Sequence, residues 1–400
     1  MLFELGPDDN SRIGGGVELH ATNLSKELVR RGHKVTYFTG AIPNCKNKTI
    51  IDNLNIKRID LCSLIKKAYK TQQLNFTRQI LFLAKTALSR HKKIVENEDF
   101  DIYHGHVYSA GLAAYLLSKK QKAVSINTIH GSYYKYWKQL TRNKLTATFF
   151  RSMERRIAPY LAKKSTYQIH TDFDFADTVK KWCKPEIQKK IITVLNGVDT
   201  KKFKPDIKPN AELSNKKGPV IMTTRRLVTK NGVIFLVRSF KQILKNFPEA
   251  ELIIIGDGPE KETIEKEIQK LEIKSRTHLI GMITNDQIPS YLSAADVIAV
   301  PSIVEASSIS VLEAMAMKKP IVASDIPGIR EITNYGKNCK LVSSMNSEEL
   351  ALGINSLLEN KEKANEIAGL GYEEILKNYT WEKKAKEIEE IYYKAQEKKE

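Results

Sequence analysis

Two carboxylates separated by seven residues stand out in the segment PSIVEASSISVLEAMAMKKPIVASDIPGIRE at 301–331. An apolar run at 296–302 precedes Glu305, and a second at 320–325 follows Glu313. This is the pattern of a strand, a loop, a helix and another strand in an open α/β sheet. Such sheets bind ligands beyond the carboxyl ends of their strands. Without the flanking strands, the pair would be better explained as part of a solvated face.

The residues between the two carboxylates predict an anion site. Ser307, Ser308 and Ile309 fall at the expected helix start, where free amides and the helix dipole favour negative charge. Glu313, about one turn into the helix, can turn back and accept hydrogen bonds from vicinal hydroxyls, such as those of a ribose. Phosphate on the amides and ribose on the carboxylate together indicate a nucleoside diphosphate.

A second loop, TTRRLVTKNG at 223–232, carries bases between a predicted strand and a predicted helix. Arginine binds phosphate with two parallel hydrogen bonds, and lysine binds it as a point charge. Arg226 and Lys230 are therefore candidate phosphate ligands. Exposed loop bases without a function are the alternative. Gly256-Asp257-Gly258 ends another predicted strand and is either part of the same site or a turn.

Near the N-terminus, a glycine-rich turn leads into an amphipathic pattern that predicts a helix ending at Gly32. Glycines at such a turn let the backbone approach a ligand closely. Gly15 and Gly16 are the preferred candidates for ligand binding, with Gly14 and Glu18 as weaker ones. The preceding strand is expected to be short or truncated, because its apolar residues before Gly6-Pro7 are Leu2, Phe3 and Leu5.

Two further strand-like runs, at 101–117 and 123–133, carry histidines at their ends. His104, His106 and His130 should lie on the ligand side of the sheet. A buried histidine that only satisfies the core is the common alternative. A metal site from these three is not expected, because their spacing does not place them on one helical turn and no acidic partner recurs.

At these motifs the chain resembles the family-four retaining glycosyltransferases, which have the GT-B fold. The resemblance comprises Glu, seven residues and Glu before a Pro-Ile-Val-Ala-Ser strand, and also the Arg226-Leu227 pair. It extends to Asp-x-x-His-x-His at 101–106, Thr-x-His-Gly at 128–131 and Asn-Gly-Val-Asp…Phe at 196–203. It therefore spans both halves of the chain.

The chain departs from the family pattern at three places. Ala306-Ser307-Ser308 replaces the usual Gly-Phe-Gly, Arg225 stands where glycine is usual, and Asn231 takes the usual lysine place, with Lys230 one residue early. Small residues after Glu305 still allow a close approach to phosphate. The contacts to the sugar are expected to differ.

The resemblance implies an α/β protein of two doubly wound, Rossmann-like domains facing a central cleft. It also implies a C-terminal helix that packs back on the N-terminal domain. The expected domains are an acceptor-side domain at 1–203, a linker at 204–218, a nucleotide-sugar-binding domain at 219–378 and the terminal helix at 379–400.

The same resemblance implies roles for the candidate residues. Glu305 would face the donor sugar and Glu313 the ribose, while His130 and His106 would contact the acceptor or the sugar. Glu305, His130, Arg226 and Lys230 form the predicted catalytic set. The predicted donor set is Gly15, Gly16, Arg226, Lys230, Ser307, Ser308, Ile309 and Glu313.

Composition narrows the class of protein. Of 400 residues, 42% are apolar and 28% are charged, as in soluble globular proteins. No apolar run approaches the ~20 residues that span a bilayer. The N-terminal segment is acidic where a signal peptide is basic, so export is not expected. The scattered cysteines, without metal or redox spacing, favour a reducing, cytoplasmic location.

The formal charge of +19 is concentrated in two windows. Residues 57–95 hold ten Lys or Arg and one acid, and residues 133–164 hold nine and one, with aromatic residues interleaved. A peripheral position on the inner, anionic face of a membrane is one explanation. Solvated faces of a lysine-rich protein are the other. Nucleic acid is disfavoured, because no recognition motif accompanies the charge.

The sequence therefore predicts a retaining hexosyltransferase that uses a UDP-, GDP- or ADP-sugar and a glycan or lipid-linked acceptor. No cofactor and no obligatory metal are expected, because the nucleotide-sugar is a substrate and cationic side chains can stabilise its phosphates. Two alternatives remain open. One is a catalytically silent nucleotide-sugar-binding scaffold, and the other is a sugar-nucleotide epimerase or phosphorylase.

Overall fold

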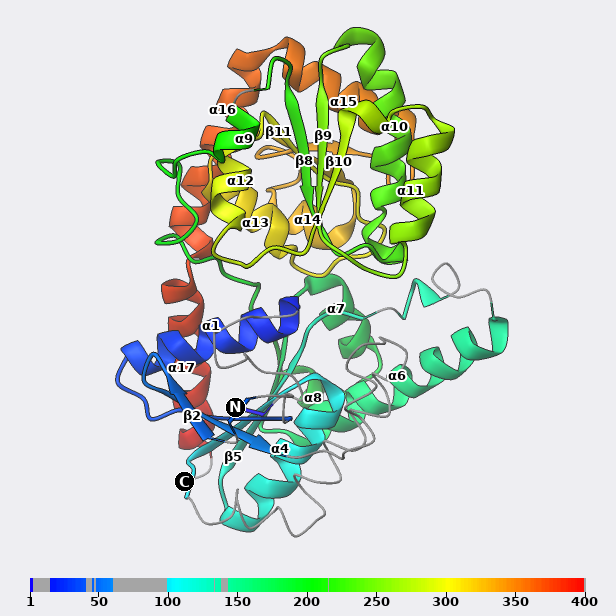
Figure 1. Cartoon of the computed structure of the whole chain (residues 1–400). Helices are drawn as coiled ribbons and strands as arrows, with labels where there is room; N and C mark the ends of the chain where they lie inside the picture. The colour runs from blue at the N-terminus through cyan, green and yellow to red at the C-terminus, as the bar shows by residue number, and fades with distance from the viewer. Residues whose placement is uncertain are drawn as a thin grey trace. The chain divides into compact units, whose positions relative to one another are not determined.

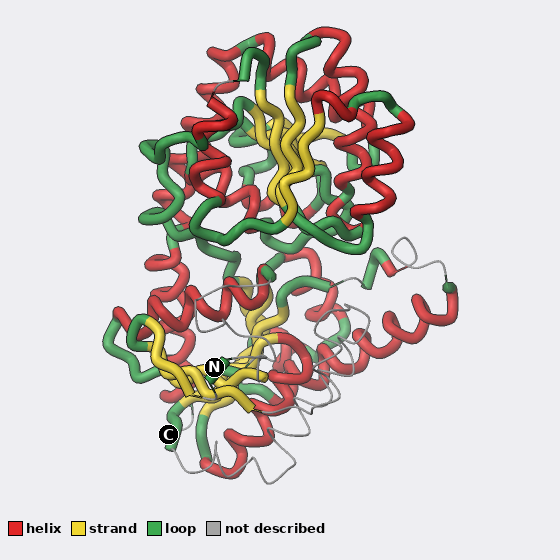
Figure 2. The backbone as a smooth tube through the Cα atoms, in the orientation of Figure 1, coloured by secondary structure: helices red, strands yellow, loops and turns green. Residues whose placement is uncertain are grey.

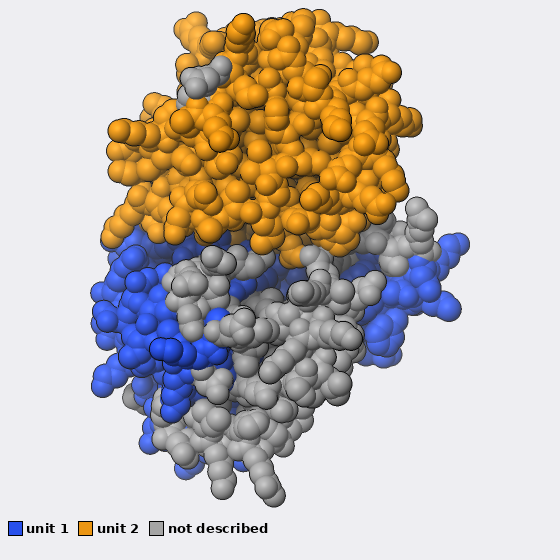
Figure 3. Space-filling view, in the orientation of Figure 1, with its two compact units in different colours: residues 1–195, 381–400 blue, residues 196–380 orange. Residues whose placement is uncertain are grey.

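The computed structural model describes residues 1–2, 15–40, 45–46, 48–59, 99–132, 134–137, 143–214 and 216–398. Gly14 and Cys62 lie outside these residues. The chain divides into two compact units (Figure 3). Unit 1 comprises Met1–Leu195 and Trp381–Glu400, and unit 2 comprises Asn196–Thr380.

Unit 2 is built on a six-stranded parallel sheet (Figure 1). Its strands are β8 (Val220–Thr224), β9 (Glu251–Ile255), β10 (Thr277–Gly281), β11 (Val297–Val300), β12 (Ile321–Ser324) and β13 (Lys340–Val342). Their order is β10-β9-β8-β11-β12-β13, so the first strand lies in the middle. This is the Rossmann strand order, in which the chain reverses direction across the sheet between β8 and β11.

Helices cover both faces of this sheet (Figure 2), which is why its strands are almost continuously apolar. The helical segments are α9 (Ala211–Ser214), η4 (Thr229–Asn231), α10 (Val233–Asn246), α11 (Lys261–Lys270), η5 (Lys274–Arg276), α12 (Ile288–Ala294), α13 (Ile309–Ala316), α14 (Pro327–Ile332), α15 (Ser347–Glu359), α16 (Lys361–Glu374) and η6 (Ile375–Tyr379). Alternate strand residues such as Ile221 and Ile254 pack against Phe240 of α10 and Ile354 of α15. This packing holds the strands in place, and with them the loops that follow their carboxyl ends.

Unit 1 has the same layered design. Its strands are β1 (Thr36–Gly40), β2 (Lys48–Ile51), β3 (Leu54–Ile59), β4 (Ile102–His106), β5 (Val124–Ile129), β6 (Tyr167–His170) and β7 (Ile191–Thr193). Its helices are α1 (Gly16–Arg30), α4 (Val107–Gln121), α6 (Lys144–Lys164), α7 (Phe173–Lys181), α8 (Pro185–Gln188) and α17 (Trp381–Glu397). The sheet is parallel except for the β2–β3 pair.

The short first strand joins the two halves of this sheet. Leu2 forms parallel bridges to Phe38 of β1 and to Gly105 of β4. Its amide donates to the His104 carbonyl at 2.8 Å, and its carbonyl accepts from the His106 amide at 3.0 Å. One described residue thus occupies the central position of the sheet. Phe3 and Leu5, which the sequence also offered for this strand, lie outside the described residues.

The terminal helix α17 packs inside unit 1, as the expected fold requires. Trp381, Ala385 and Ile388 form one buried stripe against Leu24 and Leu28 of α1. Arg31 and His33, just after α1, both contact the Glu389 carboxylate. Among the described helices, none combines the length and apolarity that a bilayer crossing requires.

Candidate active site

The residues of unit 2 that were predicted to bind the sugar donor lie near the point where the strand order reverses, between β8 and β11. Arg225 and Arg226 directly follow β8, and Glu305 lies in the loop after β11. These two strands are neighbours, and the carboxyl ends of parallel strands share one edge. Ligands of such sheets bind at this edge, where the strand order reverses.

Helix α13 begins where the sequence predicts it. Ser308 is its N-cap residue, with extended backbone angles, and its side chain accepts no capping hydrogen bond from a helix amide. The first helical hydrogen bond runs from the Leu312 amide to the Ser308 carbonyl, so the preceding amides at 309–311 have no acceptor within the helix. The Ser308 hydroxyl is buried and has no partner among the described residues. The helix start can therefore accept an anion.

The preceding residue is held by a segment that had no assigned role in the site. Ser307 Oγ accepts a hydrogen bond of 3.0 Å from the Asn196 amide, and the Asn196 side chain donates to the Ser307 carbonyl at 2.6 Å. Asn196 opens the Asn-Gly-Val-Asp segment, whose match was noted in the sequence without a mechanism. Its contacts fix the loop that leads into α13.

Glu305 is a mostly buried, ionised carboxylate. Its side chain is 14% exposed and forms an ion pair with Arg225. Burial alone would raise the pKa of the Glu305 carboxyl. The charges of Arg225 and Lys230, together with hydrogen bonds from Arg225 and Ser302, instead hold that pKa below its usual value. The site therefore contains a fixed negative charge before any donor binds.

Lys230 is tied to the same loop through its backbone. The Lys230 carbonyl accepts from the amides of Ile303 at 2.8 Å and Val304 at 3.3 Å. Gly232 ends this turn with a φ of 62°, and a Cβ there would lie 2.0 Å from the Pro301 carbonyl oxygen. Only glycine fits both constraints. Backbone hydrogen bonds thus hold the loop after β8 against the loop after β11.

Arg226 and Arg225 follow the same strand but differ completely in environment. The Arg226 side chain is exposed and has no partner among the residues that the structure describes. It is free to meet a phosphate. Arg225, in contrast, is 8% exposed and bonds to four side chains. Arg225 was not among the residues predicted for the site.

Glu313 lies one turn into α13 and is 5% exposed. Burial raises the pKa of its carboxyl to about 8, and the charges of Lys202 and Arg225 only partly oppose this. No other described residue donates a hydrogen bond to the Glu313 carboxylate. A buried polar group normally has such a partner, so this one is placed to receive donors from a ligand.

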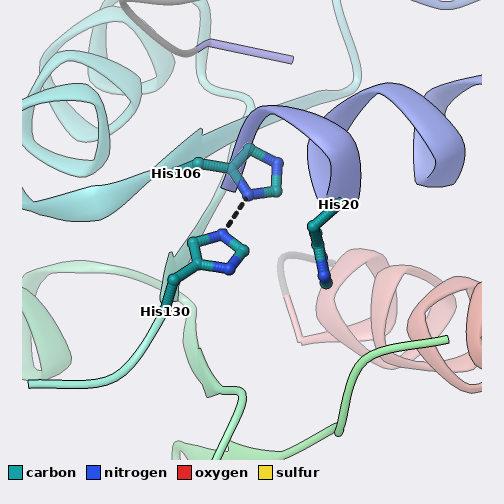
Figure 4. Close-up of side chains that lie close together, drawn as sticks. All are labelled: His20, His106 and His130. Atoms are coloured by element: carbon teal, nitrogen blue, oxygen red, sulfur yellow. Dashed lines mark hydrogen bonds between the residues drawn. The ribbon is translucent and has the colours of Figure 1, made fainter. Parts of the chain in front are cut away.

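In unit 1, three histidines from separate elements converge (Figure 4). His106 ends β4, His130 follows β5 and His20 lies on α1. His106 Nδ1 and His130 Nε2 share a hydrogen bond of 2.9 Å, and the His20 ring lies edge-on to His130 at 4.6 Å between centroids. His20 was not predicted, because it appeared only as one more position of an amphipathic helix.

The environment of these rings favours neutral imidazoles. Burial, reinforced by the neighbouring histidines, holds the pKa values of His106 and His130 well below the usual range. A ligand nitrogen of each of His20, His106 and His130 lies within 4.8 Å of the others. Neutral imidazoles this close could hold a metal ion or hydrogen-bond a sugar hydroxyl. The set differs from the three histidines considered from the sequence.

His104 has a structural role instead. Its two ring nitrogens hydrogen-bond Tyr392 of α17 and Thr128 of β5, each at 2.6 Å. Gly15 and Gly16 lie at the start of α1, where Gly15 is the extended N-cap and a Cβ added to it would meet nothing within 4 Å. Glu18, in the first turn, is buried.

Family models match both units of the chain. The model of glycosyl transferases group 1 matches residues 205–373, and that of glycosyltransferase family 4 matches residues 14–202. An uncharacterized glycosyltransferase of Methanocaldococcus jannaschii is 24% identical over 95% of both chains. The phosphatidyl-myo-inositol mannosyltransferase of Mycolicibacterium smegmatis is 23% identical over 95% of this chain and 90% of that one.

Solved structures show the same fold. Sucrose-phosphate synthase from Thermosynechococcus elongatus superimposes with a TM-score of 0.82, at 19% identity and 98% coverage of both chains. HepE of Anabaena, solved in complex with UDP-glucose, gives 0.73 at 19% identity, with 98% of this chain and 97% of that chain covered. The two family models together match both units of the chain, and the solved structures share its fold. The chain therefore belongs to the group 1, family 4 glycosyltransferases and has the GT-B fold.

Proposed function

We propose that this protein is a retaining glycosyltransferase that moves a hexose from a UDP-, GDP- or ADP-sugar to a glycan or lipid-linked acceptor. The observation that carries the proposal is the buried Glu313 carboxylate of α13, which accepts no hydrogen bond from the described residues and follows the open amides at the start of that helix. Vicinal ribose hydroxyls would supply those donors while the phosphates occupy the helix start. The UDP-glucose complex of HepE supports a nucleotide-sugar donor.

In the proposed reaction, the bond between the anomeric carbon and the β-phosphate oxygen breaks, and its electron pair leaves with the nucleoside diphosphate. The acceptor hydroxyl forms the new bond to the same carbon, and its proton passes to a phosphate oxygen of the leaving group. Charge therefore grows on the phosphate in the transition state. Arg226, Lys230 and the amides at 309–311 would stabilise it, and no cofactor is needed for that step.

The histidines of unit 1 would serve the acceptor side. Burial holds the pKa values of both the His106 and His130 rings well below the usual range, which favours neutral imidazoles. His106 is fully buried, with Nδ1 bonded to His130 Nε2 and Nε2 3.4 Å from Met1 Sδ, so it would position His130. His130 is only partly buried, and its other ring nitrogen would bond a sugar or acceptor hydroxyl. Glu305 would contact the donor sugar as a fixed anion. Its charge would favour the electron-poor anomeric carbon that forms as the leaving group departs.

A thermal-shift screen with UDP-, GDP- and ADP-sugars tests the donor class. A ligand present at 100 times its Kd adds ~2.7 kcal/mol to the stability of the folded state. We expect one base to give a clear shift, followed by release of its nucleoside diphosphate when acceptor is added. NMR of fresh product from an α-linked donor should show an α-linkage, and a β-linkage would contradict retention.

A catalytically silent nucleotide-sugar-binding scaffold is the second candidate. It is favoured by the ion pair between Glu305 and Arg225, which already occupies the carboxylate expected to face the sugar. Such a protein would bind a nucleotide-sugar tightly and neither hydrolyse nor transfer it. Single-turnover incubation with radiolabelled donor distinguishes the two functions.

We also propose that the protein acts at the cytoplasmic face of a membrane. Leu145 and Phe149, one turn apart on α6, are 81% and 59% exposed, and Arg155 and Arg156 on the same helix are exposed as well. Apolar and basic side chains together suit an anionic bilayer. The relative that uses a phosphatidyl-inositol acceptor supports a lipid-linked acceptor.

Cosedimentation with phosphatidylglycerol vesicles tests this location. Binding should fall in high salt and in the double variant Leu145→Ser/Phe149→Ser, because both the charge and the apolar contact contribute. Leu352→Ser, which removes an exposed leucine of unit 2, is the matched control. Equal binding of all three proteins would contradict the proposal.

A further inference from the structure

Arg225 departs from the family pattern and yet lies at the centre of the unit 2 site. Its Nη2 donates to Asn231 Oδ1 at 2.7 Å, to Ser302 Oγ at 2.9 Å and to Glu305. Its Nη1 lies 3.3 Å from Ser310 Oγ, in the first turn of α13. A buried guanidinium with four side-chain partners cannot be a solvated loop base.

The orientation of Asn231 is fixed by its two hydrogen bonds. Its Nδ2 donates to the Arg226 carbonyl at 2.8 Å, which leaves Oδ1 facing Arg225. The end of side chain 231 and the carboxylate of Glu305 therefore contact the same Nη2 nitrogen. In the family pattern described above, position 231 carries lysine and position 225 carries glycine.

We infer that side chains at positions 225 and 231 can each supply the cation that pairs with Glu305, at one site that we call the cation place. In this chain Arg225 is the positioning residue that occupies it. Its guanidinium holds Glu305 toward the donor sugar and leaves Arg226 and Lys230 for the phosphates. The catalytic part of this inference rests on the function proposed above. The sharing of the cation place does not, because it concerns only contacts within unit 2.

The inference requires the two positions to be coupled. Glycine at 225 leaves the buried Glu305 carboxylate without its main partner, which is costly for folding and removes the carboxylate's fixed direction. Lysine at 231 extends beyond the reach of asparagine and can bring its ammonium to the vacated place. Lysine at 231 with Arg225 still present puts two cations side by side, so the effects of the two changes cannot simply add.

The test is a double-mutant cycle of Arg225→Gly, Asn231→Lys and the two together. Donor turnover is measured with whichever of UDP-glucose, GDP-mannose and ADP-glucose shifts wild-type melting most, and melting temperature is recorded for every variant. For Arg225→Gly we expect turnover to fall roughly 10²-fold or more, with a smaller change in donor KM. Asn231→Lys alone should also lose turnover and stability.

The double variant decides the matter. Recovery of most of the lost turnover and melting temperature, despite two individually harmful changes, is the expected result. If the losses of turnover and of melting temperature in the double variant equal the sums of the single losses, positions 225 and 231 do not share the cation place. Recovery of stability without turnover would overturn the positioning role.

Further arms keep the two proposals separable. If no nucleotide-sugar binds the wild type, the proposed function fails, and the stability cycle still tests the shared place. If Arg225→Gly does not fold, Arg225→Gly/Glu305→Gln removes the unpaired carboxylate and should fold. Failure of that variant, too, would show that Arg225 acts through contacts other than Glu305. Arg225→Lys, which keeps a charge without the fork of donors, should retain stability better than Arg225→Gly.

Discussion

The buried carboxylate of Glu305 in unit 2 lies against the guanidinium of Arg225, whereas the buried rings of His106 and His130 in unit 1 bond to each other. Opposite charges lower the pKa of Glu305 despite its burial. Burial and neighbouring imidazoles lower the pKa values of the two histidines. One cluster is charged before any ligand arrives, and the other is neutral.

This difference indicates how the chemistry is divided between the units. Groups that stabilise a growing phosphate charge act best when they are already charged and fixed in place. Groups that contact neutral sugar hydroxyls need only hydrogen bonds, and a neutral imidazole offers both a donor and an acceptor. The following changes are expected to alter one cluster while leaving the other intact.

The largest effect is expected from Lys230→Ala, in the charged cluster. Removing this cation should lower donor turnover by roughly 10²-fold or more, the loss typical of a group that stabilises transition-state charge. Lys261→Ala, at an exposed lysine that begins α11, is the control and should remain active. Turnover near the wild-type value would remove Lys230 from the proposed mechanism.

Glu313→Gln should weaken nucleotide binding. Ribose hydroxyls bond best to the ionised carboxylate, so the amide should weaken binding of the nucleoside diphosphate by roughly tenfold or more. In the wild type, binding should also weaken as the pH falls below about 8, where Glu313 takes up a proton. Isothermal titration with UDP, GDP and ADP at several pH values measures both effects.

The same variant changes the pH dependence of folding. The folded-state pKa of Glu313 is about 8, above the usual 4.5, so between these values the folded chain keeps a proton that the unfolded chain has lost. This contribution therefore lowers stability as the pH rises, by about 1.4 kcal/mol per pH unit. Glu313→Gln should unfold with a flatter pH profile, and an unchanged slope would contradict the assigned pKa.

His106→Asn tests the neutral cluster, where the sign is opposite. The depressed pKa of His106 means that the unfolded chain takes up a proton below pH ~6.5 while the folded chain does not. Wild-type stability should fall as the pH drops from 7 to 5, by up to about 1.4 kcal/mol per pH unit for each such ring. The variant should lose less over this range, and an identical slope would show that His106 does not contribute.

The smallest effect is expected from metal removal. If Arg226, Lys230 and the α13 amides handle the phosphate charge, dialysis against EDTA should leave nucleotide binding and turnover unchanged. Loss of activity that Zn²⁺ restores in the wild type but not in His106→Asn would instead identify the histidine cluster as a metal site. Both proteins should be assayed at the same pH, because proton uptake competes with metal.

Much of the fold could be predicted from local patterns. Helix α13 starts at Ile309, as expected, because a loop of small residues gives way to an apolar pattern there. Helix α12 begins at Ile288, because Thr284 and Gln287 close a turn ahead of Pro289. The two Rossmann-like sheets follow from alternating strand and helix segments, and both were confirmed.

The contacts inside the site could be predicted less well. Arg225 meets Ser302 and Glu305, which lie 77 and 80 residues away in the chain, so its burial depends on the register of β8 beside β11. His20 carries the same pattern signal as any buried position of α1. Asn196 had a motif match, but its bonds to Ser307 cross 111 residues. Such partners become visible only when the sheet brings them together.

The single Nη2 atom shared by Asn231 and Glu305 also constrains how this chain could have diverged from its relatives. On the inference above, an ancestor with glycine at 225 and lysine at 231 could reach the present pair only through an unfavourable intermediate. Losing the lysine first leaves the acid unpaired, and gaining the arginine first puts two cations side by side. The two exchanges are therefore expected to have occurred close together.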